Sequence, residues 1–228
     1  MASTLGYRFF DKNGNTLSPI GENLNAIADF QIVDSIDLQN ITFIVATDVT
    51  NPFFGKNGAA YIYGKQKGAS EKVIKELDIG LENLNNVFKK KLNIDLKEIK
   101  GSGAAGGLGG GAFVFLNAKI ISAADFIFEL CDLHQKIAKT DIVISGEGRI
   151  DDQTWNGKLI AQLLKSSNEK KVILIGGSIE TTIENKSNII LTDQIKTSEM
   201  TLPYAKKNAE MLLLEKGKKI GEFLKSYL

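Results

Sequence analysis

The stretch Asp141-Ile-Val-Ile-Ser-Gly-Glu-Gly-Arg-Ile-Asp-Asp152 is an apolar run that ends abruptly in small and acidic residues. Two other stretches share this design, Ile41-Thr-Phe-Ile-Val-Ala-Thr-Asp48 and Lys171-Val-Ile-Leu-Ile-Gly-Gly-Ser178. Near-continuous runs of β-branched residues are typical of strands that are covered on both faces. Ligands of α/β proteins bind just beyond the carboxyl ends of such strands, so these glycines and carboxylates are candidate site residues. For the Gly-Gly pair of the third stretch, a simple tight turn is the alternative.

Strands and helices are expected to alternate in the second half of the chain. The apolar runs predict strands at 142–145, 172–175 and 189–192, with helices at about 157–166 and from about 200 or 204 to 227. Such alternation indicates βαβ units and a parallel sheet. In the first half, residues 21–32 predict a short helix, and Ser70 followed by Glu71 predicts the start of a long one. The composition changes near residues 120–125, where we place the domain boundary.

The segment 101–111 holds seven glycines in eleven residues and leads into a predicted helix that continues through Leu116. Its Gly101-Ser-Gly-Ala-Ala-Gly106 formally matches the dinucleotide fingerprint, but the preceding residues 93–100 are too polar for the buried strand that this fingerprint requires. The glycines instead predict backbone N–H groups that bind an anion near a helix N-terminus. Close backbone packing without a ligand is the alternative.

Acidic and basic residues crowd together after the predicted strand at 142–145. Glu147, Asp151 and Asp152 lie beside Arg149, and Lys158 follows at the start of the next predicted helix. Carboxylates next to basic residues are suited to hold Mg²⁺ and phosphate oxygens together. Asp151 and Asp152 are adjacent, so both are not expected to face one point, and we favour Asp151. A solvated cluster of ion pairs is the alternative.

The composition excludes several classes of protein. Lys and Arg number 28 against 27 Asp and Glu in 228 residues, and no basic block predicts a nucleic-acid or membrane surface. The single cysteine, Cys131, allows no internal disulfide, as expected in a reducing, cytoplasmic compartment. The single histidine, His134, excludes a multi-histidine metal site and is expected at a helix surface or end. No apolar stretch predicts a membrane span, and the N-terminus does not look like a signal peptide.

Five short motifs occur in an order and spacing that resemble the bacterial glycerate 2-kinase family, with its glycerate kinase type-1 fold. They are Asp48-Val-Thr-Asn-Pro52, Asn57-Gly-Ala59, Gln66-Lys-Gly-Ala69, Gly103-Ala-Ala-Gly-Gly-Leu-Gly109 and Ser145-Gly-Glu-Gly-Arg-Ile-Asp151, the last followed by Gln153-Thr154 and Gly157-Lys158. The resemblance covers roughly residues 5–180, and the C-terminal part follows the family pattern more loosely.

The resemblance implies an α/β fold with two domains. One is a flavodoxin-like parallel-sheet domain built from both chain ends, and the other is an α/β domain inserted within it. We expect residues 1–123 to form part of the inserted domain and residues 124–228 the C-terminal part of an incomplete flavodoxin-like domain.

The resemblance also implies a kinase that transfers the γ-phosphoryl group of ATP to the 2-hydroxyl of D-glycerate with Mg²⁺. Asp48, Glu147 and Asp151 are the expected catalytic residues and Mg²⁺ ligands, with their separate roles left open. The expected substrate- or phosphate-binding residues are Asn51, Lys67, Gly103, Gly106, Gly107, Arg149 and Lys158. A non-catalytic fragment or interaction module that retains the kinase fold is the alternative, and a nucleotide-binding oxidoreductase is a third, weaker one.

Two departures from the family pattern affect these expectations. Thr50 stands where the family commonly has an aspartate, so only Asp48 and Asn51 are carried over from that motif. Family members are also longer and carry N-terminal motifs that have no counterpart in this sequence. We therefore expect a truncated kinase with little activity alone, whose uncovered strand edges favour self-association or docking of a complementing N-terminal chain.

Overall fold

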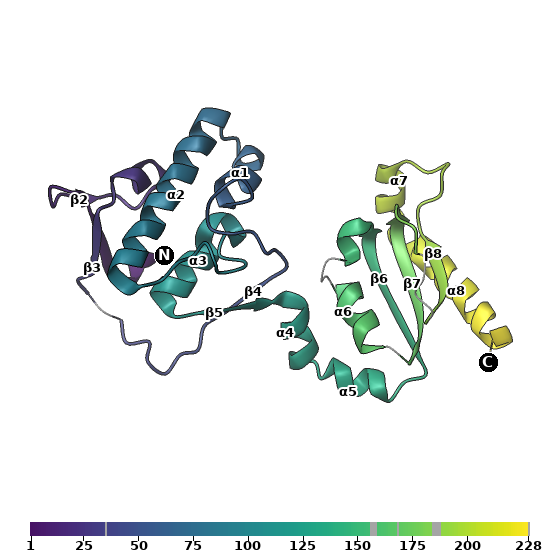
Figure 1. Ribbon diagram of the computed structural model, residues 1–228. Helices are drawn as coiled ribbons and strands as arrows, with labels where there is room; N and C mark the ends of the chain where they lie inside the picture. The colour runs from purple at the N-terminus through teal and green to yellow at the C-terminus, as the bar shows by residue number, and fades with distance from the viewer. Residues whose placement is uncertain (35, 156–158, 168, 184–187, 228) are drawn as a thin grey trace. The chain divides into compact units, whose positions relative to one another are not determined.

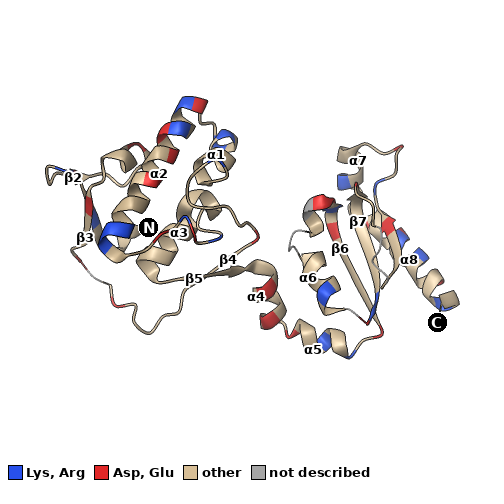
Figure 2. Ribbon diagram, in the orientation of Figure 1, with Lys and Arg blue, Asp and Glu red and all other residues tan. Residues whose placement is uncertain are grey.

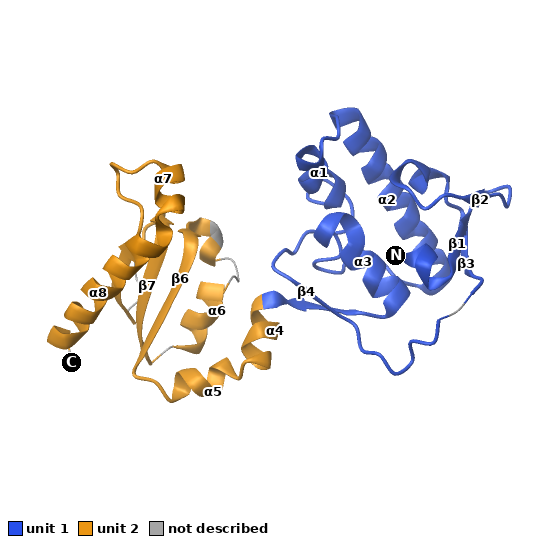
Figure 3. Ribbon diagram, turned by 180° about the vertical axis from the view of Figure 1, so that it is seen from behind, with its two compact units in different colours: residues 1–123 blue, residues 124–228 orange. Residues whose placement is uncertain are grey.

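The structure is a computed structural model that describes residues 1–34, 36–155, 159–167, 169–183 and 188–227 (Figure 1). The chain forms two compact units, Met1–Ala123 (unit 1) and Ala124–Leu228 (unit 2) (Figure 3). Each combines helices with β-strands, and acidic and basic residues are interspersed in both (Figure 2). None of the helices in the described ranges is long and apolar enough to cross a membrane.

Unit 1 contains two small sheets. Strands β1 (Tyr7–Phe10), β2 (Thr16–Leu17) and β3 (Asp29–Ile32) form an antiparallel sheet in the order β2-β1-β3. Strands β4 (Ile44–Thr47) and β5 (Lys119–Ser122) form a parallel pair in which Thr47 lies opposite Ser122. β4 therefore ends one residue before Asp48, as the sequence predicts. Both Ile44 and Ile41 are exposed, so the expected cover on both faces is not seen for this run.

The predicted helix at 21–32 is wrong. Residues Gly21–Ala26 form only a 3-10 helix (η2), and Asp29–Ile32 form β3. Phe30 pairs with Phe9 of β1 and enters the core, so non-local strand pairing overrides the local pattern. The ring of Phe30 also packs edge-to-face on Phe88, with centroids 5.7 Å apart.

The long helix α2 (Glu71–Leu92) confirms its predicted start. The Ser70 hydroxyl accepts a hydrogen bond from the Val73 N–H at 3.4 Å, which is the geometry of an N-cap. Asn93 ends the helix with φ +57°, a left-handed conformation that asparagine tolerates well. The helix buries Ile74, Leu81, Leu84 and Phe88 against the unit 1 core. Unit 1 also contains the 3-10 helices η1 (Ala2–Leu5) and η3 (Lys65–Lys67) and the helices α1 (Ala59–Tyr63) and α3 (Ala104–Leu116).

Unit 2 is built on a parallel sheet of order β6-β7-β8, which confirms the predicted parallel pairing. Its strands are β6 (Ile142–Ile150), β7 (Lys171–Ile179) and β8 (Ile189–Gln194). Its helices are α4 (Ala123–Leu130), α5 (Leu133–Ala138), α6 (Leu159–Ser166), α7 (Leu202–Lys207) and α8 (Ala209–Tyr227). Val172 and Leu174 of β7 are fully buried in a core shared with α4, α5 and α6, and α8 runs along the other side of the sheet (Figure 1).

β6 and β7 continue well beyond the predicted strands, so two interpretations need correction. Glu147 pairs with Gly176 and Arg149 with Ser178, which places the expected Gly-Gly turn and the first part of the expected acidic loop, through Ile150, inside the ladder. The glycines allow this close approach: a Cβ on Gly146 would lie 2.2 Å from the Ile175 carbonyl oxygen. Glycine thus serves strand packing at this point rather than a turn.

Candidate functional site

In unit 1 the segment that follows β4 packs directly against the glycine-rich loop. The Gly103 N–H donates a hydrogen bond to the Asn51 carbonyl oxygen at 2.9 Å. A Cβ on Gly103 would lie 2.1 Å from the Pro52 carbonyl oxygen, so no larger residue fits without movement. At Gly101 a Cβ would lie 3.2 Å from the Val49 carbonyl oxygen, which brings the neighbourhood of Asp48 to the same loop.

Both polar atoms of the Asn51 side-chain amide make hydrogen bonds. Its Nδ2 donates to the Asn57 carbonyl oxygen at 2.9 Å, and its Oδ1 accepts from the Tyr63 hydroxyl at 3.0 Å. Burial raises the pKa of Tyr63 above its ordinary value. The network gives Asn51 a structural part in shaping the 51–58 segment, in addition to the substrate contact that its motif predicts.

The glycine-rich loop enters α3 through three successive left-handed residues. Ala105, Gly106 and Gly107 have φ values of +53°, +76° and +93°, which are accessible to glycine but costly for other residues. A Cβ on Gly106 would lie 3.2 Å from the Lys67 Nζ, so this ammonium group sits beside the loop backbone. Among the described backbone hydrogen bonds that reach outside the helices and strands, none is donated by the N–H of Ala105 or Gly106. The Lys67 ammonium group therefore lies beside the left-handed turn of the loop at Gly106.

Asp78 of α2 is a residue of this neighbourhood that the sequence did not reveal. Its Oδ1 accepts a hydrogen bond from the Gly55 N–H at 2.8 Å, and this fixes the turn between Asn51 and Asn57. Burial raises the pKa of Asp78, with the Gly55 hydrogen bond opposing the shift. Tyr63 was also missed. Both contacts join residues twelve or more positions apart, and no local pattern signals such pairs.

In unit 2 the predicted acidic residues lie at the carboxyl end of β6 and in the 3-10 helix η4 (Asp152–Trp155). Fully buried Thr154 links two of them: its hydroxyl donates to Glu147 Oε2 at 3.1 Å and accepts from the Asp151 N–H at 3.1 Å. Because Oε2 is engaged by Thr154, Oε1 is the oxygen of Glu147 without a hydrogen bond to the described residues.

Arg149 is already paired with carboxylates. Its Nε lies 3.3 Å from Asp151 Oδ2, and its Nη2 lies 2.5 Å from Glu180 Oε2. The predicted site residues Arg149 and Asp151 thus take part in ion pairs with each other and with Glu180, as in the alternative of a solvated ion-pair cluster. Lys158 lies outside the described residues.

The structure therefore brings the predicted residues together in two sets. In unit 1, Asn51, Lys67 and the three glycines share one neighbourhood, which Asp48 borders through Val49. In unit 2, Glu147, Arg149 and Asp151 share another. Over the described ranges, no three His, Cys, Asp or Glu side chains are grouped closely enough to hold a metal ion by themselves.

These features define a mixed α/β protein with parallel sheets, a glycine-rich loop beside a lysine, and carboxylates at a strand end. The sequence model of the glycerate kinase family matches residues 1–225. The chain belongs to the glycerate kinase family.

Named relatives and a solved structure agree with this assignment. The chain is 41% identical to a glycerate 2-kinase of Escherichia coli over 184 residues, which cover 78% of this chain and 48% of the relative. It is 36% identical to a glycerate kinase of Bacillus cereus, with 92% of this chain and 56% of the relative covered. A solved structure from Salmonella typhimurium LT2, described as a glycerate kinase 2, superposes with a TM-score of 0.78 at 31% identity and covers 99% of this chain and 60% of its own. The chain thus spans about half the length of the curated relatives it matches.

Proposed function

We propose that this chain carries the chemistry of a glycerate kinase, in which the γ-phosphoryl group of ATP passes to the 2-hydroxyl of D-glycerate and yields 2-phosphoglycerate. Its membership of the glycerate kinase family supports this reaction class. We further infer that unit 1 corresponds to an inserted α/β domain and unit 2 to the C-terminal part of a flavodoxin-like domain. The parallel order β6-β7-β8 supports the second inference.

The observation that carries the proposal is the position of Lys67 beside the left-handed turn of the glycine-rich loop. The ammonium group lies beside the loop backbone at Gly106, and a cation next to left-handed, glycine-rich backbone favours a carboxylate or a phosphate oxygen. Gly103 and Gly107 let the loop pack closely on Pro52 and Phe53, which side chains at these positions would meet. We infer that this loop binds the carboxylate of glycerate or a transferring phosphate.

The acidic residues of unit 2 suit a Mg²⁺ ion that is held mainly by nucleotide and water. Mg²⁺ in phosphoryl-transfer sites is usually bound through one or two carboxylates together with substrate phosphates. Glu147 Oε1 is available for this contact, and Asp151 can join it if its pairing with Arg149 loosens. When bound, Mg²⁺ would neutralise charge on the transferring phosphates. Arg149 and Lys158 are proposed to bind phosphate oxygens.

Catalysis of phosphoryl transfer depends mainly on positioning the two substrates and on neutralising the negative charge of the transferring phosphoryl group. The 2-hydroxyl oxygen forms a bond to the γ-phosphorus, the bond from that phosphorus to the β,γ-bridging oxygen breaks, and ADP leaves. The hydroxyl proton passes to a carboxylate, for which Asp48 at the end of β4 is the proposed acceptor, with Glu147 and Asp151 as the other candidates. ATP and Mg²⁺ are the proposed co-reactants.

The deciding experiment incubates the purified chain with ATP and Mg²⁺, with D-glycerate or L-glycerate, and follows ADP by chromatography. Phosphorus NMR of the product distinguishes 2-phosphoglycerate from 3-phosphoglycerate. A parallel reaction adds a polypeptide that corresponds to the unmatched N-terminal portion of a relative. We expect ADP formation that depends on D-glycerate and is strongest in the complemented reaction. If both reactions lack it, the kinase proposal is wrong and the non-catalytic alternative stands.

A further inference from the structure

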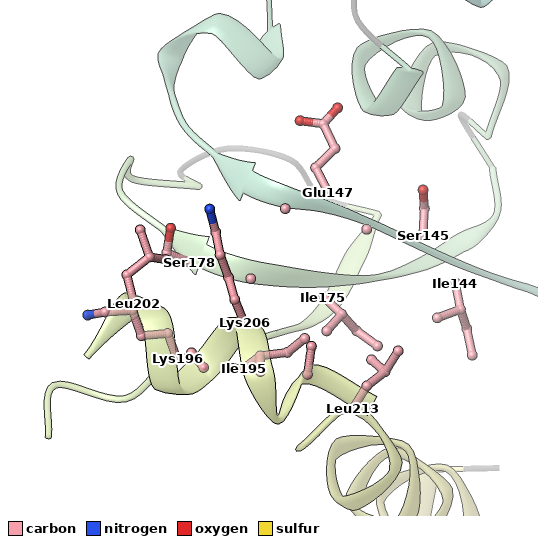
Figure 4. Close-up of a pocket in the computed structure, with 15 residues that line it drawn as sticks. Ile144, Ser145, Glu147, Ile175, Ser178, Ile195, Lys196, Leu202, Lys206 and Leu213 are labelled. Atoms are coloured by element: carbon pink, nitrogen blue, oxygen red, sulfur yellow. The ribbon is translucent and has the colours of Figure 1, made fainter. Parts of the chain in front are cut away.

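Unit 2 contains a pocket of about 580 Å³ (Figure 4). Glu147 is among its lining residues, but most of the others have no role in the site described above. It lies on the face of the sheet that is turned toward α7 and α8, near the carboxyl ends of β6 and β7. Small-molecule sites typically occupy about 300–1,000 Å³, and in parallel sheets they occur beyond the carboxyl ends of the strands. Both the size and the place suit a ligand pocket.

The two ends of this pocket differ in chemistry. Ile144, Ile175 and Leu213 lie toward one end, together with Ser145, whereas Ser178, Lys196 and Lys206 lie toward the other, together with Leu202 (Figure 4). The side chain of Ile144 is 52% exposed although it sits in a strand, so the apolar end has a wall that no described residue covers. A ligand that fills both ends must combine an apolar body with an anionic part.

The lysines at the polar end are available to such an anion. The described ion pairs of unit 2 engage Arg149 with Asp151 and Glu180, and Lys216 with Asp193. They include neither Lys196 nor Lys206, whose positive charges therefore lack acidic partners among the described residues. Two uncompensated cations at one end of an apolar pocket attract a compact group with several negative charges.

We propose that this pocket binds a purine nucleoside triphosphate, with the purine ring against Ile144, Ile175 and Leu213 and the phosphates toward Lys196 and Lys206. The inference rests on the proposed function, because a kinase needs a site for the purine ring of its nucleotide, and nothing above assigns that site. Glu147 lines the same pocket. Glu147 would therefore contact a Mg²⁺ ion bound to the phosphates of the nucleotide, which accounts for its position on β6.

A binding experiment on the full chain tests this assignment without any need for turnover. The protein is labelled with ¹³C at the isoleucine δ1 methyl groups and titrated with MgATP, with adenosine and with tripolyphosphate. We expect MgATP to shift the methyl resonances of Ile144, Ile175 and Ile195 and to leave those of Ile20 and Ile36 in unit 1 unchanged. Adenosine should shift Ile144 and Ile175 more weakly, and tripolyphosphate should leave Ile144 unchanged.

Matched variants locate the two halves of the ligand. Lys206→Gln should weaken MgATP binding about fivefold, as expected for one partly exposed charge contact, whereas Lys207→Gln on the same helix should not. Ile144→Ser should weaken binding of MgATP and adenosine but not of tripolyphosphate. Since all three side chains are exposed, none of these substitutions opens a cavity in the core.

The result that overturns the inference is MgATP binding that leaves the pocket methyls unshifted or is insensitive to Lys206→Gln. Shifts confined to unit 1 would do the same while leaving the kinase proposal intact. Conversely, pocket shifts without ADP formation in the complemented reaction would support the nucleotide site and contradict the kinase. Absence of any MgATP binding overturns the inference. If a polypeptide instead occupies the pocket, its addition should shift the same methyls and exclude adenosine, which would also overturn it.

Discussion

The amide side chain of Asn85 in α2 binds the backbone of Leu96, whose N–H donates to Asn85 Oδ1 at 2.8 Å. The same amide donates from Nδ2 to Asp95 Oδ1 at 3.0 Å. The fully buried Ser102 then donates to the Leu96 carbonyl oxygen at 2.8 Å. Helix α2 is thereby connected, through Leu96, to the first turn of the glycine-rich loop. The position of the proposed anion site therefore depends on the buried hydrogen bond between Asn85 and Leu96.

Replacing Asn85 should therefore destabilise unit 1. Asn85→Ala leaves the buried N–H of Leu96 without an acceptor, which costs about 1–3 kcal/mol of unfolding free energy. Asn86→Ala at the exposed next position is the matched control and should change stability by less than about 0.5 kcal/mol. Urea unfolding of both variants measures the difference. Equal stabilities would show that the Asn85 amide does not hold the loop.

The carboxylate of Asp95 makes this region sensitive to acid. Hydrogen bonds from Lys89 and Asn85 lower the pKa of Asp95 to about 2 from its usual 3.8. Because the folded-state pKa is depressed, the stabilisation is fully present above about pH 4 and is lost as the pH falls toward 2. Urea midpoints of wild type and Asp95→Asn should differ most at pH 5–7 and converge near pH 2.

Comparing wild type with Asp95→Asn cancels the contribution of other acid-sensitive groups to the pH dependence of stability. Hydrogen bonds also lower the pKa values of Asp11 and Asp29, but those residues are present in both proteins and cancel in the difference. A gap between the two midpoints that stays constant from pH 7 to pH 2 would contradict the assignment to Asp95.

Gly103 is expected to tolerate no side chain. Its backbone is not left-handed, with φ −78°, so the cost of Gly103→Ala is steric and comes from the 2.1 Å approach to the Pro52 carbonyl oxygen. We expect a loss of about 1–3 kcal/mol in unfolding free energy together with weaker anion binding. Gly217→Ala in α8 is the control. A Cβ added at Gly217 would have nothing within 4 Å apart from the backbone of its own helix, so this substitution should stabilise the helix by about 1 kcal/mol.

The sequence predicts those features of the fold that depend on local chemistry. Ser70 begins α2 where its hydroxyl can cap the helix, and the apolar runs at 142–145 and 172–175 lie in parallel strands. Residues 93–100 form no strand, in agreement with the argument against a dinucleotide fold. In each case a short pattern has one dominant physical consequence.

The features that the sequence does not reveal depend on partners far along the chain. Residues 29–32 pair with β1 instead of forming a helix, because Phe30 gains a place beside Phe9 and Phe88. β6 extends to Ile150 because glycines in both strands let the backbones approach. At the candidate site the residue types are predictable, but their hydrogen-bond partners Tyr63 and Asp78 become visible only in three dimensions.

Charge removal at the end of β6 should affect nucleotide binding more than folding. Glu147→Gln and Asp151→Asn each delete a carboxylate that is only half-buried, so unfolding free energies should fall by no more than about 1 kcal/mol. Affinity for MgATP should fall about tenfold if a metal–carboxylate contact is lost. Asp152→Asn is the matched control, since Asp152 is exposed and accepts a hydrogen bond from Thr181. A large loss of stability with unchanged MgATP affinity would refute a ligand role.

Thr154 should act through Glu147 rather than on the ligand itself. Its side chain is fully buried, and its hydroxyl is the donor that holds Glu147 Oε2 while accepting from the Asp151 N–H. Thr154→Val keeps the shape of the side chain but removes both hydrogen bonds. We expect it to cost about 1–3 kcal/mol in stability and to raise the Mg²⁺ concentration needed for half-maximal ATP binding severalfold, because the Glu147 carboxylate loses its fixed orientation.

Thr154→Ser separates this positioning role from a purely structural one. The serine hydroxyl can restore both hydrogen bonds, while the lost methyl group leaves a small cavity that still costs about 1 kcal/mol. We therefore expect Thr154→Ser to be less stable than wild type yet normal in its Mg²⁺ requirement, and Thr154→Val to be impaired in both. The measurement is an ATP-binding isotherm at a series of Mg²⁺ concentrations, paired with urea unfolding. If the Mg²⁺ requirement follows stability across the two variants, or does not change in either, Thr154 has no positioning role.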